Sequence, residues 1–304
     1  PEVSLKKLWK KLHDMTGDII TDLRSSGSRP HSAVIVFSSP WYFSEVRQFT
    51  HTADAPMEIT EKLLEKFMEE EEELFRAASL ERFRVSVDEV AILEPERMRV
   101  TLNGYPTTSI VGKRATTIEA FLYLSAVFGR ALDDVKTLLS DQGIRLAGIQ
   151  TSPMAFYTTA VEIGIADEGR VVVDIGDEIT EVSLIKNGIL YDSVSYARGL
   201  NFVARRLAEA LSIDAEAAIT YLQNYGADAL ESGKAAKAKK IVEEAVAEWQ
   251  ELLEEALDHV SSKGLLPETA LVAGPGSILN EFMTAVSREE FRRFTIFGRP
   301  FTVE

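Results

Sequence analysis

An aspartate and a glycine end an apolar run in the second half of the chain, Val171-Val172-Val173-Asp174-Ile175-Gly176. A carboxylate at the end of a buried strand can hold a metal-bound water. A neighbouring glycine lets the N–H groups of the turn approach an anion. The segment therefore favours binding of a phosphorylated ligand, although Asp and Gly are also ordinary turn residues.

A second small-residue segment, Ala273-Gly274-Pro275-Gly276-Ser277, lies between an expected strand and an expected helix. Small residues permit a planar ring or a phosphate to lie against the backbone and the helix N-terminus. Between the two segments come an Asn187-Gly188 hairpin turn, Gly199 before a helix, and a helical stretch. This order is more informative than either segment alone.

Composition excludes several classes of function. The chain has 33 Lys and Arg against 48 Asp and Glu, a net charge of -15, so its surface repels nucleic acid. It has no cysteine, which removes thiolate nucleophiles, cysteine metal sites and disulfides. The four histidines have no metal-ligand spacing. No apolar run reaches the roughly 18 to 20 residues of a membrane-spanning helix.

Apolar periodicity in the first half predicts a small α+β unit after an opening helix over 3–23. Ala33 to Phe37 is typical of a buried strand, with Arg47 to Thr52 as its expected partner. A helix is expected over 59–78 with Thr60 as its cap, and we interpret its acidic run Glu69 to Glu73 as a solvated face. Further strands are expected over 85–93, 98–102 and 116–125.

The second half changes to an α/β pattern. After a helix over 131–142, a short strand over 146–149 and a helix over 153–163, a three-strand meander is expected. Further helices, another strand and a strand-like end then follow. The expected ranges of this last part are 169–175, 178–186 and 189–196 for the meander, 201–211, 214–225 and 235–261 for helices, 269–272 for the strand, and 294–303 for the end.

These segments together resemble the actin-like ATPase superfamily, and within it the FtsA family of cell-division proteins, with the PilM pilus-assembly family as a near relative. VVVDIGDEITEVSLIKNGILYDSVSYARGLNFVARRLAEAL is similar to that superfamily's second phosphate segment, and ALVAGPGSILNEFM to its adenosine segment. Upstream, VSVDEVAILEPERMRVTLNGYPTT, GKRATTIEAFLYLS and LAGIQTSPMAFYTTA resemble the FtsA inserted subdomain and the return to the first domain.

The resemblance implies a nucleotide site that binds ATP and Mg²⁺. Asp174 matches the residue that organises Mg²⁺ through water, Gly176 a phosphate amide, and Thr180 a hydroxyl of the same loop. Gly199 matches the glycine before the helix, and Glu216 an acidic position near the ribose. Gly274, Gly276 and Ser277 match the adenosine turn. A catalytic residue is not assigned.

Departures from the family pattern weaken the expected site. Asp177, Glu178 and Ile179 stand where relatives have Gly-Gly-Thr, and each added carboxylate costs on the order of 1 to 4 kcal/mol beside a phosphate at about 4 Å. Ile219 stands where relatives often have Lys, and Pro275 replaces a middle glycine. The family's first phosphate hairpin, expected before the opening helix, is missing from the sequence.

We therefore expect an α/β, actin-like (ribonuclease-H-like) fold with an FtsA-type α+β inserted subdomain. The expected domains are a remnant of the first actin-like domain over 1–30, the insert over 31–143, and a return to the first domain over 144–166. The second domain is expected over 167–304, with a helical insert over 212–262.

The function implied by the resemblance is a cytoplasmic cell-division scaffold, peripheral to the inner face of the membrane, with at most weak ATPase activity. Its implied partners are the tubulin-like protein FtsZ and further copies of itself in a head-to-tail filament. The amphipathic C-terminal helix with which FtsA proteins dock to the membrane has no counterpart before Glu304.

Two alternatives stay open. One is a PilM-like adaptor that binds the tail of an inner-membrane pilus or secretion protein, and the nucleotide motifs do not distinguish it from FtsA. The turn Leu102 to Pro106 and the paired strands of the insert favour FtsA. The other is a sugar- or acetate-kinase-type phosphotransferase, against which Asp177, Glu178 and the missing hairpin argue.

Overall fold

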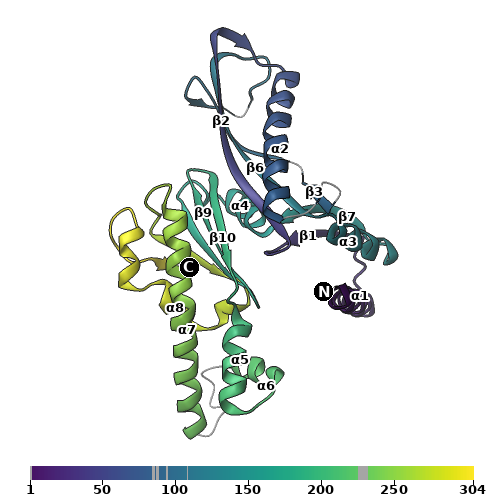
Figure 1. Cartoon of the computed structure of the whole chain (residues 1–304), viewed down its shortest axis with the longest axis vertical. Coiled ribbons are helices and arrows are strands. Elements are labelled where there is room, and N and C mark those ends of the chain that lie inside the picture. Colours follow the sequence, from purple (N-terminus) through teal and green to yellow (C-terminus); the bar gives the residue numbers. More distant parts are fainter. Residues whose placement is uncertain (1, 84–85, 87–88, 94, 108, 225–231) are drawn as a thin grey trace. The chain divides into compact units, whose positions relative to one another are not determined.

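A computed structural model describes residues 2–83, 86, 89–93, 95–107, 109–224 and 232–304 (Figure 1). The chain divides into two compact units, Pro1–Ala155 and Phe156–Glu304. Parts of the strand expected over 85–93 and the end of the helix expected over 214–225 lie outside the described residues. Within the described part of the chain, no helix is long and apolar enough to cross a membrane.

The first unit contains a two-stranded sheet and a larger antiparallel sheet. Its elements are α1 (Glu2–Ser25), β1 (Ser32–Phe37), β2 (Tyr42–Glu58), α2 (Glu61–Phe83), β3 (Val90–Ile92), β4 (Glu96–Leu102), β5 (Tyr105–Pro106), β6 (Arg114–Phe128), α3 (Gly129–Asp141), β7 (Arg145–Thr151) and α4 (Ser152–Glu162), which continues into the second unit.

Strand β1 forms where Ala33 to Phe37 predicts it, but its expected partner was wrong. It pairs in parallel with β7, while Arg47 to Thr52 belongs to β2 and pairs with β6. Parallel strands need a long crossover, which the whole inserted segment and α3 provide here. The larger sheet therefore begins at β2. Strand β1 does not belong to it, because β1 pairs with β7, which lies in the range 144–166 expected to return to the first domain.

The larger sheet has the strand order β2-β6-β4-β5, with β3 also paired to β6. Helix α2 lies along β2 and β6 (Figure 1). Its residues Phe67 and Phe75 are buried against the sheet in two clusters, one with Ile118 and one with Leu122. The predicted cap is present, because the Leu63 N–H donates to the Thr60 hydroxyl at 3.2 Å.

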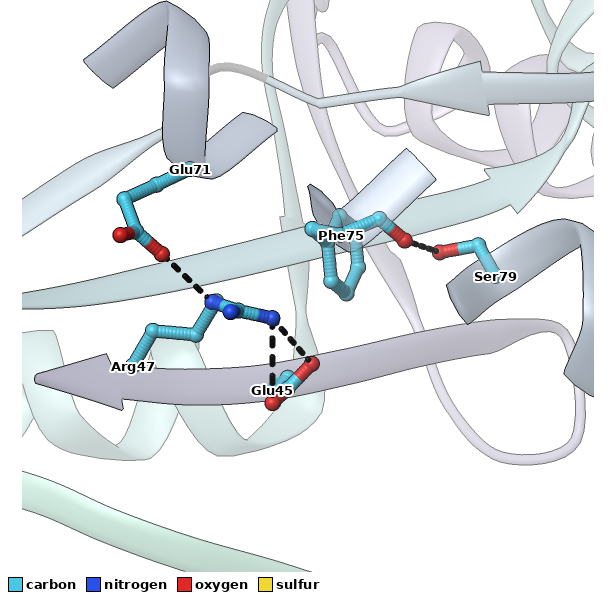
Figure 2. Close-up of polar contacts among 5 residues, drawn as sticks. All are labelled: Glu45, Arg47, Glu71, Phe75 and Ser79. Carbon is cyan, nitrogen blue, oxygen red and sulfur yellow. Dashed lines mark hydrogen bonds and ion pairs between the residues drawn. The ribbon is translucent and has the colours of Figure 1, made fainter. Parts of the chain in front are cut away.

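One residue of the acidic run on α2 contacts the sheet (Figure 2). The Arg47 Nε on β2 donates to the Glu71 carboxylate at 2.7 Å, and its Nη1 lies 3.4 Å from both carboxylate oxygens of Glu45. Arg47 and Glu71 side chains are only 24% and 19% exposed. The interpretation of this run as a solvated face therefore fails at Glu71, which fastens α2 to β2.

The second unit is a five-stranded sheet with helices, in the strand order β10-β9-β8-β11-β12. Strands β8, β9 and β10 form the predicted antiparallel meander, and β11 runs parallel to β8 and β12. Its elements are β8 (Arg170–Ile175), β9 (Thr180–Lys186), β10 (Ile189–Tyr196), α5 (Leu200–Leu211), α6 (Ala215–Gln223), α7 (Ser232–Ser261), β11 (Thr269–Ala273), the 3-10 helix η2 (Pro275–Ile278), α8 (Asn280–Val286), the 3-10 helix η3 (Glu289–Phe294) and β12 (Thr302–Val303).

Alternation along β8 decides which side chains enter the core. Val171, Val173 and Ile175 belong to the main core with side chains of α5, α7 and α8. Trp249 of α7 is fully buried in this core and packs edge-on against Phe282 of α8, with ring centroids 4.7 Å apart. Since successive side chains of a strand alternate, Asp174 is left on the opposite face of the sheet.

The C-terminal segment forms less strand than predicted. Of the expected range 294–303, Thr302 and Val303 form β12, and Thr295 makes one isolated parallel bridge with Leu266. The rest is a turn, in which the Thr295 hydroxyl accepts from the Arg299 N–H at 3.1 Å and donates to the Arg299 carbonyl at 2.7 Å. Pro300 follows this turn, and proline has no N–H for a ladder.

Candidate functional site

The two glycine segments predicted from the sequence meet at the C-terminal ends of β8 and β11. Asp174 is paired in register with Ala273 of β11 and with Glu181 of β9. A Cβ added at Gly274 would lie 2.5 Å from the Asp174 Oδ1 and 2.6 Å from the Ile175 carbonyl. The aspartate and the second turn are therefore in direct contact, at the edge of the sheet where α/β folds bind ligands.

Asp174 is partly removed from solvent at this position. Burial raises the pKa of Asp174 above its usual range. A carboxylate whose charge is poorly solvated gains from a nearby cation or from hydrogen-bond donors. The group assigned to Mg²⁺ from sequence is therefore placed where a hydrated cation would stabilise its charge.

A second carboxylate at the site, Glu181, was not singled out from the sequence. Directly opposed residues of an antiparallel pair share a face, so Glu181 lies beside Asp174 on the sheet. It is 6% exposed, and its carboxylate accepts from the Ser193 hydroxyl at 2.9 Å. Burial raises the pKa of Glu181 to about 7. The sequence did contain a signal for this residue. Glu181 is a charged residue inside an otherwise mostly apolar strand, and it lies two residues from Ser183, on the same face of that strand.

The loop after Asp174 is fastened to the start of α5. The Gly176 N–H donates to the Ile179 carbonyl at 2.9 Å, while the Gly176 and Asp177 carbonyls accept from the Leu200 and Asn201 N–H groups at 2.9 and 2.8 Å. The Gly176 amide expected to bind phosphate therefore has a partner within the loop. The N–H groups of residues 177–179 make no hydrogen bond within the described part of the chain.

Gly199 permits this close approach of loop and helix. A Cβ at Gly199 would lie 2.3 Å from the Gly176 carbonyl oxygen and 2.6 Å from that of Asp177. Real Cβ atoms do not come so near, so a larger residue would push the loop away from α5. The role of Gly199 in this structure is to let the backbone of Gly176 and Asp177 lie against the start of α5.

One of the two added acidic residues is neutralised by α5. The Glu178 carboxylate accepts from the Arg205 guanidinium at 2.9 and 3.0 Å and from the Asn201 amide at 3.1 Å. The hydrogen bond from Arg205 lowers the pKa of Glu178 below its usual range. The expected repulsion between Glu178 and a phosphate is thus relieved by an arginine, while Asp177 is exposed.

The Thr180 hydroxyl makes two buried hydrogen bonds and lies away from solvent. It accepts from the Trp249 Nε1 at 2.8 Å and donates to the Arg198 carbonyl at 2.7 Å, and Thr180 is fully buried. A hydroxyl has one donor proton, so its donor capacity is used here. Thr180 links the loop, α7 and the turn before α5.

The second turn is shaped by contacts with β8. Gly274 has φ +81°, a left-handed conformation that glycine adopts without strain, and a Cβ at Gly276 would lie 2.2 Å from the Ile175 Cγ2. The Ser277 hydroxyl donates to the Gly274 carbonyl at 2.8 Å. The helix predicted from Ile278 forms as α8 from Asn280, and the turn before it is the 3-10 helix η2, which ends at Ile278.

Glu216 is the predicted site residue that the structure does not bring to this cluster. It is exposed in the first turn of α6, after Asp214, whose side chain caps the helix by accepting from the Ala217 N–H at 2.8 Å. Glu216 has no hydrogen bond or ion pair within the described residues. Its position in this structure suits the positive end of the α6 dipole.

Metal-ligating groups are sparse. Among the described residues, no group of three or more His, Cys, Asp or Glu side chains could hold a metal ion directly. The open N–H groups of residues 177–179 and the half-buried Asp174 fit a phosphate with a hydrated cation.

No protein-family model matches the chain, and no curated protein matches it. Among solved structures, a PilM–PilN type IV pilus biogenesis complex contains a chain that is 18% identical and has a TM-score of 0.63, covering 89% of this chain and 73% of that one.

Two other solved structures are less similar. The ethanolamine utilization protein EutJ from Carboxydothermus hydrogenoformans is 21% identical, with a TM-score of 0.40 and coverage of 56% of this chain and 55% of that one. MreB 5 of Spiroplasma citri bound to AMPPNP is 15% identical, with a TM-score of 0.41 and coverage of 58% and 60%.

The similarity to the PilM–PilN structure shows the fold. The chain has the actin-like fold that the segments around Asp174 and Gly274 predict, and the matched chain of the PilM–PilN structure has a similar fold. The α/β pattern of the second half is confirmed by the pairing of β8 with β9 and β11.

Proposed function

We propose that this protein is a nucleotide-binding assembly adaptor of the PilM type, which holds a segment of a partner protein. The observation that carries the proposal is the likeness to a chain of a PilM–PilN complex, which extends over 89% of this chain. Such an extent takes in residues from both compact units. It supports a PilM-like function as much as the FtsA-like function that the sequence resemblance implies, and the FtsA-like function is therefore kept as the second candidate.

The nucleotide part of the proposal rests on the cluster around Asp174. The N–H groups of residues 177–179 would hold the phosphates of ATP, and Asp174 would hold Mg²⁺ through water. Gly274 and Gly276 would support the adenosine at the second turn. The bound nucleotide would supply negative phosphate charge and a divalent cation to this end of the sheet, with ATP turnover no more than weak.

Calorimetry of ATP with Mg²⁺ tests this part. Micromolar binding is expected for the unchanged chain and for Asp133→Ala, which removes an exposed carboxylate from α3. Asp174→Ala is expected to lose at least tenfold in affinity, because it removes the half-buried carboxylate. Equal binding by both variants, or no binding by the unchanged chain, would refute the nucleotide site.

Partner choice tests the adaptor part separately. A PilM-like adaptor is expected to bind a synthetic peptide of PilN, the partner in the solved PilM–PilN complex, and not to co-sediment with FtsZ filaments. The readouts are fluorescence anisotropy for the peptide and pelleting for the filaments. If the chain co-sediments with FtsZ filaments and does not bind the peptide, the assignment is reversed.

An FtsA-like division scaffold is the second candidate. The observations in its favour are the turn between β4 and β5, where Asn103 and Gly104 have φ 51° and 82°, and the paired strands on either side of that turn. In this case the chain would link FtsZ to the inner face of the membrane and form head-to-tail filaments. Light scattering with ATP would detect such filaments.

A further inference from the structure

The outermost strand of the larger sheet, β2, has an unpaired edge. It comes first in the order β2-β6-β4-β5, and among the described strands it pairs with β6 alone. Over residues 44–52 its register with residues 117–125 of β6 is uninterrupted, and every residue of both stretches is described. Within the described part of the chain, residues 44–52 make no backbone hydrogen bond other than those with β6. Such an edge can pair with another strand.

The features that commonly protect an edge strand come after this stretch. Bulges, prolines and lysines discourage pairing at an edge. On β2 the register with β6 shifts between Thr52 and Met57, and Pro56 lies within that shift. Residues 44–52 contain no proline and no lysine. Their arginine, Arg47, bonds Glu71 of α2 over one face of the sheet (Figure 2). The edge of residues 44–52 is therefore open to a partner strand.

The outward-pointing backbone groups of this stretch belong to its even-numbered residues. On β6, the Thr117 carbonyl accepts from the Asn103 N–H at 2.9 Å and the Ser125 carbonyl from the Leu93 N–H at 2.8 Å. The odd-numbered residues of β6 thus face away from β2, and its even-numbered residues face β2. The register pairs these with odd-numbered residues of β2. The N–H and C=O groups that point outward are those of residues 44, 46, 48, 50 and 52.

The stretch is complementary to a second copy of itself. An antiparallel pairing that uses all of residues 44–52 is centred on Gln48, so Gln48 lies opposite Gln48 of the other copy. It places Glu45 opposite His51, whose imidazole N–H can donate to the carboxylate. It also places Arg47 opposite Phe49, where a guanidinium can lie over the ring. The remaining residues pair Val46 with Thr50 and Ser44 with Thr52.

A shift of this pairing by one residue loses the complementarity. Centred on Arg47, the pairing opposes the arginines of the two copies. Centred on Phe49, it opposes Arg47 and His51. Like charges directly opposite each other are destabilising, so the pairing centred on Gln48 is favoured over both neighbours.

We propose that two copies of this chain associate through β2, antiparallel about a two-fold axis at Gln48, so that their larger sheets form one continuous sheet. The axis is perpendicular to the sheet, so α2 of each copy lies on the same face. A two-fold contact uses the same surface of both copies and closes at the dimer, in contrast to a head-to-tail filament contact. The inference concerns the first unit and goes beyond the proposed adaptor function.

Sedimentation velocity of the whole chain over a series of concentrations tests the proposal. The unchanged chain is expected to dimerise, and Gln48→Ala, which keeps the backbone N–H, is expected to change the dimer Kd less than twofold. Gln48→Pro removes the outward N–H on the axis and is expected to raise the Kd at least tenfold. Proline is accommodated in an edge strand where the N–H faces solvent, and circular dichroism melting checks that the variant folds.

A charge exchange at Gln48 tests the register. Gln48→Lys and Gln48→Glu each oppose like charges across the axis, and each is expected to raise the Kd at least tenfold. An equal mixture of the two variants opposes unlike charges and is expected to dimerise about as well as the unchanged chain. Gln223→Lys and Gln223→Glu, at an exposed residue of α6, make the same charge changes and are expected to alter the Kd less than twofold.

Several results would overturn the proposal. A chain that stays monomeric at every concentration would refute the dimer, and dimers that Gln48→Pro leaves unchanged would refute the β2 edge. A mixture of Gln48→Lys and Gln48→Glu that dimerises no better than either alone would refute the register. If a PilN peptide dissociates the dimer and Gln48→Pro abolishes binding of that peptide, a partner segment occupies the edge in place of a second copy.

Discussion

Replacing Glu181 with glutamine is expected to remove a pH-dependent loss of stability from the second unit. Burial raises the pKa of Glu181 from its ordinary value of 4.5 to about 7. The folded state therefore keeps the proton up to neutral pH, whereas the unfolded chain releases it near its ordinary pKa. The free energy of unfolding falls as the pH rises between these two values, and the contribution is constant above and below them.

The size of the effect follows from the pKa difference. One pKa unit corresponds to about 1.4 kcal/mol, so the shift of Glu181 corresponds to roughly 3 kcal/mol over the full range. The chain has a pI near 4.9, which argues for working above that value. Between pH 5.5 and 8.5, about 2 kcal/mol of the fall remains measurable. Glu181→Gln has the same shape without the ionisation and should lack this fall.

Urea unfolding at several pH values from 5.5 to 8.5 measures the effect. Trp249, fully buried in the second unit, is the reporter once Trp9 and Trp41 have been replaced by phenylalanine. The difference in unfolding free energy between Glu181→Gln and its parent should grow by about 2 kcal/mol in favour of the variant as the pH rises. Glu209→Gln, which removes an exposed carboxylate from α5, is the matched control.

A difference that stays constant with pH to within about 0.5 kcal/mol would refute the reasoning, because it would mean that Glu181 ionises alike in the folded and unfolded chain. Carbon-13 NMR gives an independent check. A side-chain carboxyl resonance that titrates with a midpoint near 7 should be present in the unchanged chain and absent from Glu181→Gln. Its absence from the unchanged chain would contradict the assignment.

Three further predictions concern contacts within one or the other unit. Thr180→Val should cost about 1 to 3 kcal/mol in chemical unfolding, because it leaves Trp249 without its acceptor, and Thr180→Ser should lose less. Gly199→Ala should cost about 1 to 3 kcal/mol through overpacking, whereas Gly17→Ala in α1 should be neutral or stabilising; the reverse order would contradict the contact. A double-mutant cycle of Arg47→Ala and Glu71→Ala should give a coupling of about 1 kcal/mol, and zero coupling would show that the pair adds nothing.

Local pattern was sufficient to predict most elements and the pairing of strands joined by short turns, but it did not predict the pairing of β1, whose partner is far away in the sequence. The turn at Asn187 and Gly188, with φ 53° and 67°, fixes the hairpin between β9 and β10 because its residues accept the left-handed conformation. No local signal identifies β7 as the partner of β1. That pairing joins residues separated by the whole insert, and hydrophobic alternation is the same whichever strand lies alongside.

The same distinction applies to the candidate site. Asp174 and Gly274 were found because glycines beside a strand end are visible in the sequence, and their contact follows from the pairing of β8 with β11. Glu181 was missed because its importance depends on register: only the pairing of β9 with β8 places it opposite Asp174. Glu216 was chosen by resemblance alone, and its exposed position at the start of α6 has no link to the cluster.

The net negative charge around the loop of residues 176–179 is smaller than the number of acidic residues there suggests. Asp174, Asp177, Glu178 and Glu181 together would place four negative charges where a nucleotide phosphate should lie. Arg205 neutralises Glu178, and a pKa of about 7 leaves Glu181 roughly half protonated at neutral pH. A phosphate at this loop would therefore meet mainly Asp174, which a hydrated Mg²⁺ would screen, and the exposed Asp177, which water screens. The acidic sequence of the loop is compatible with nucleotide binding for this reason.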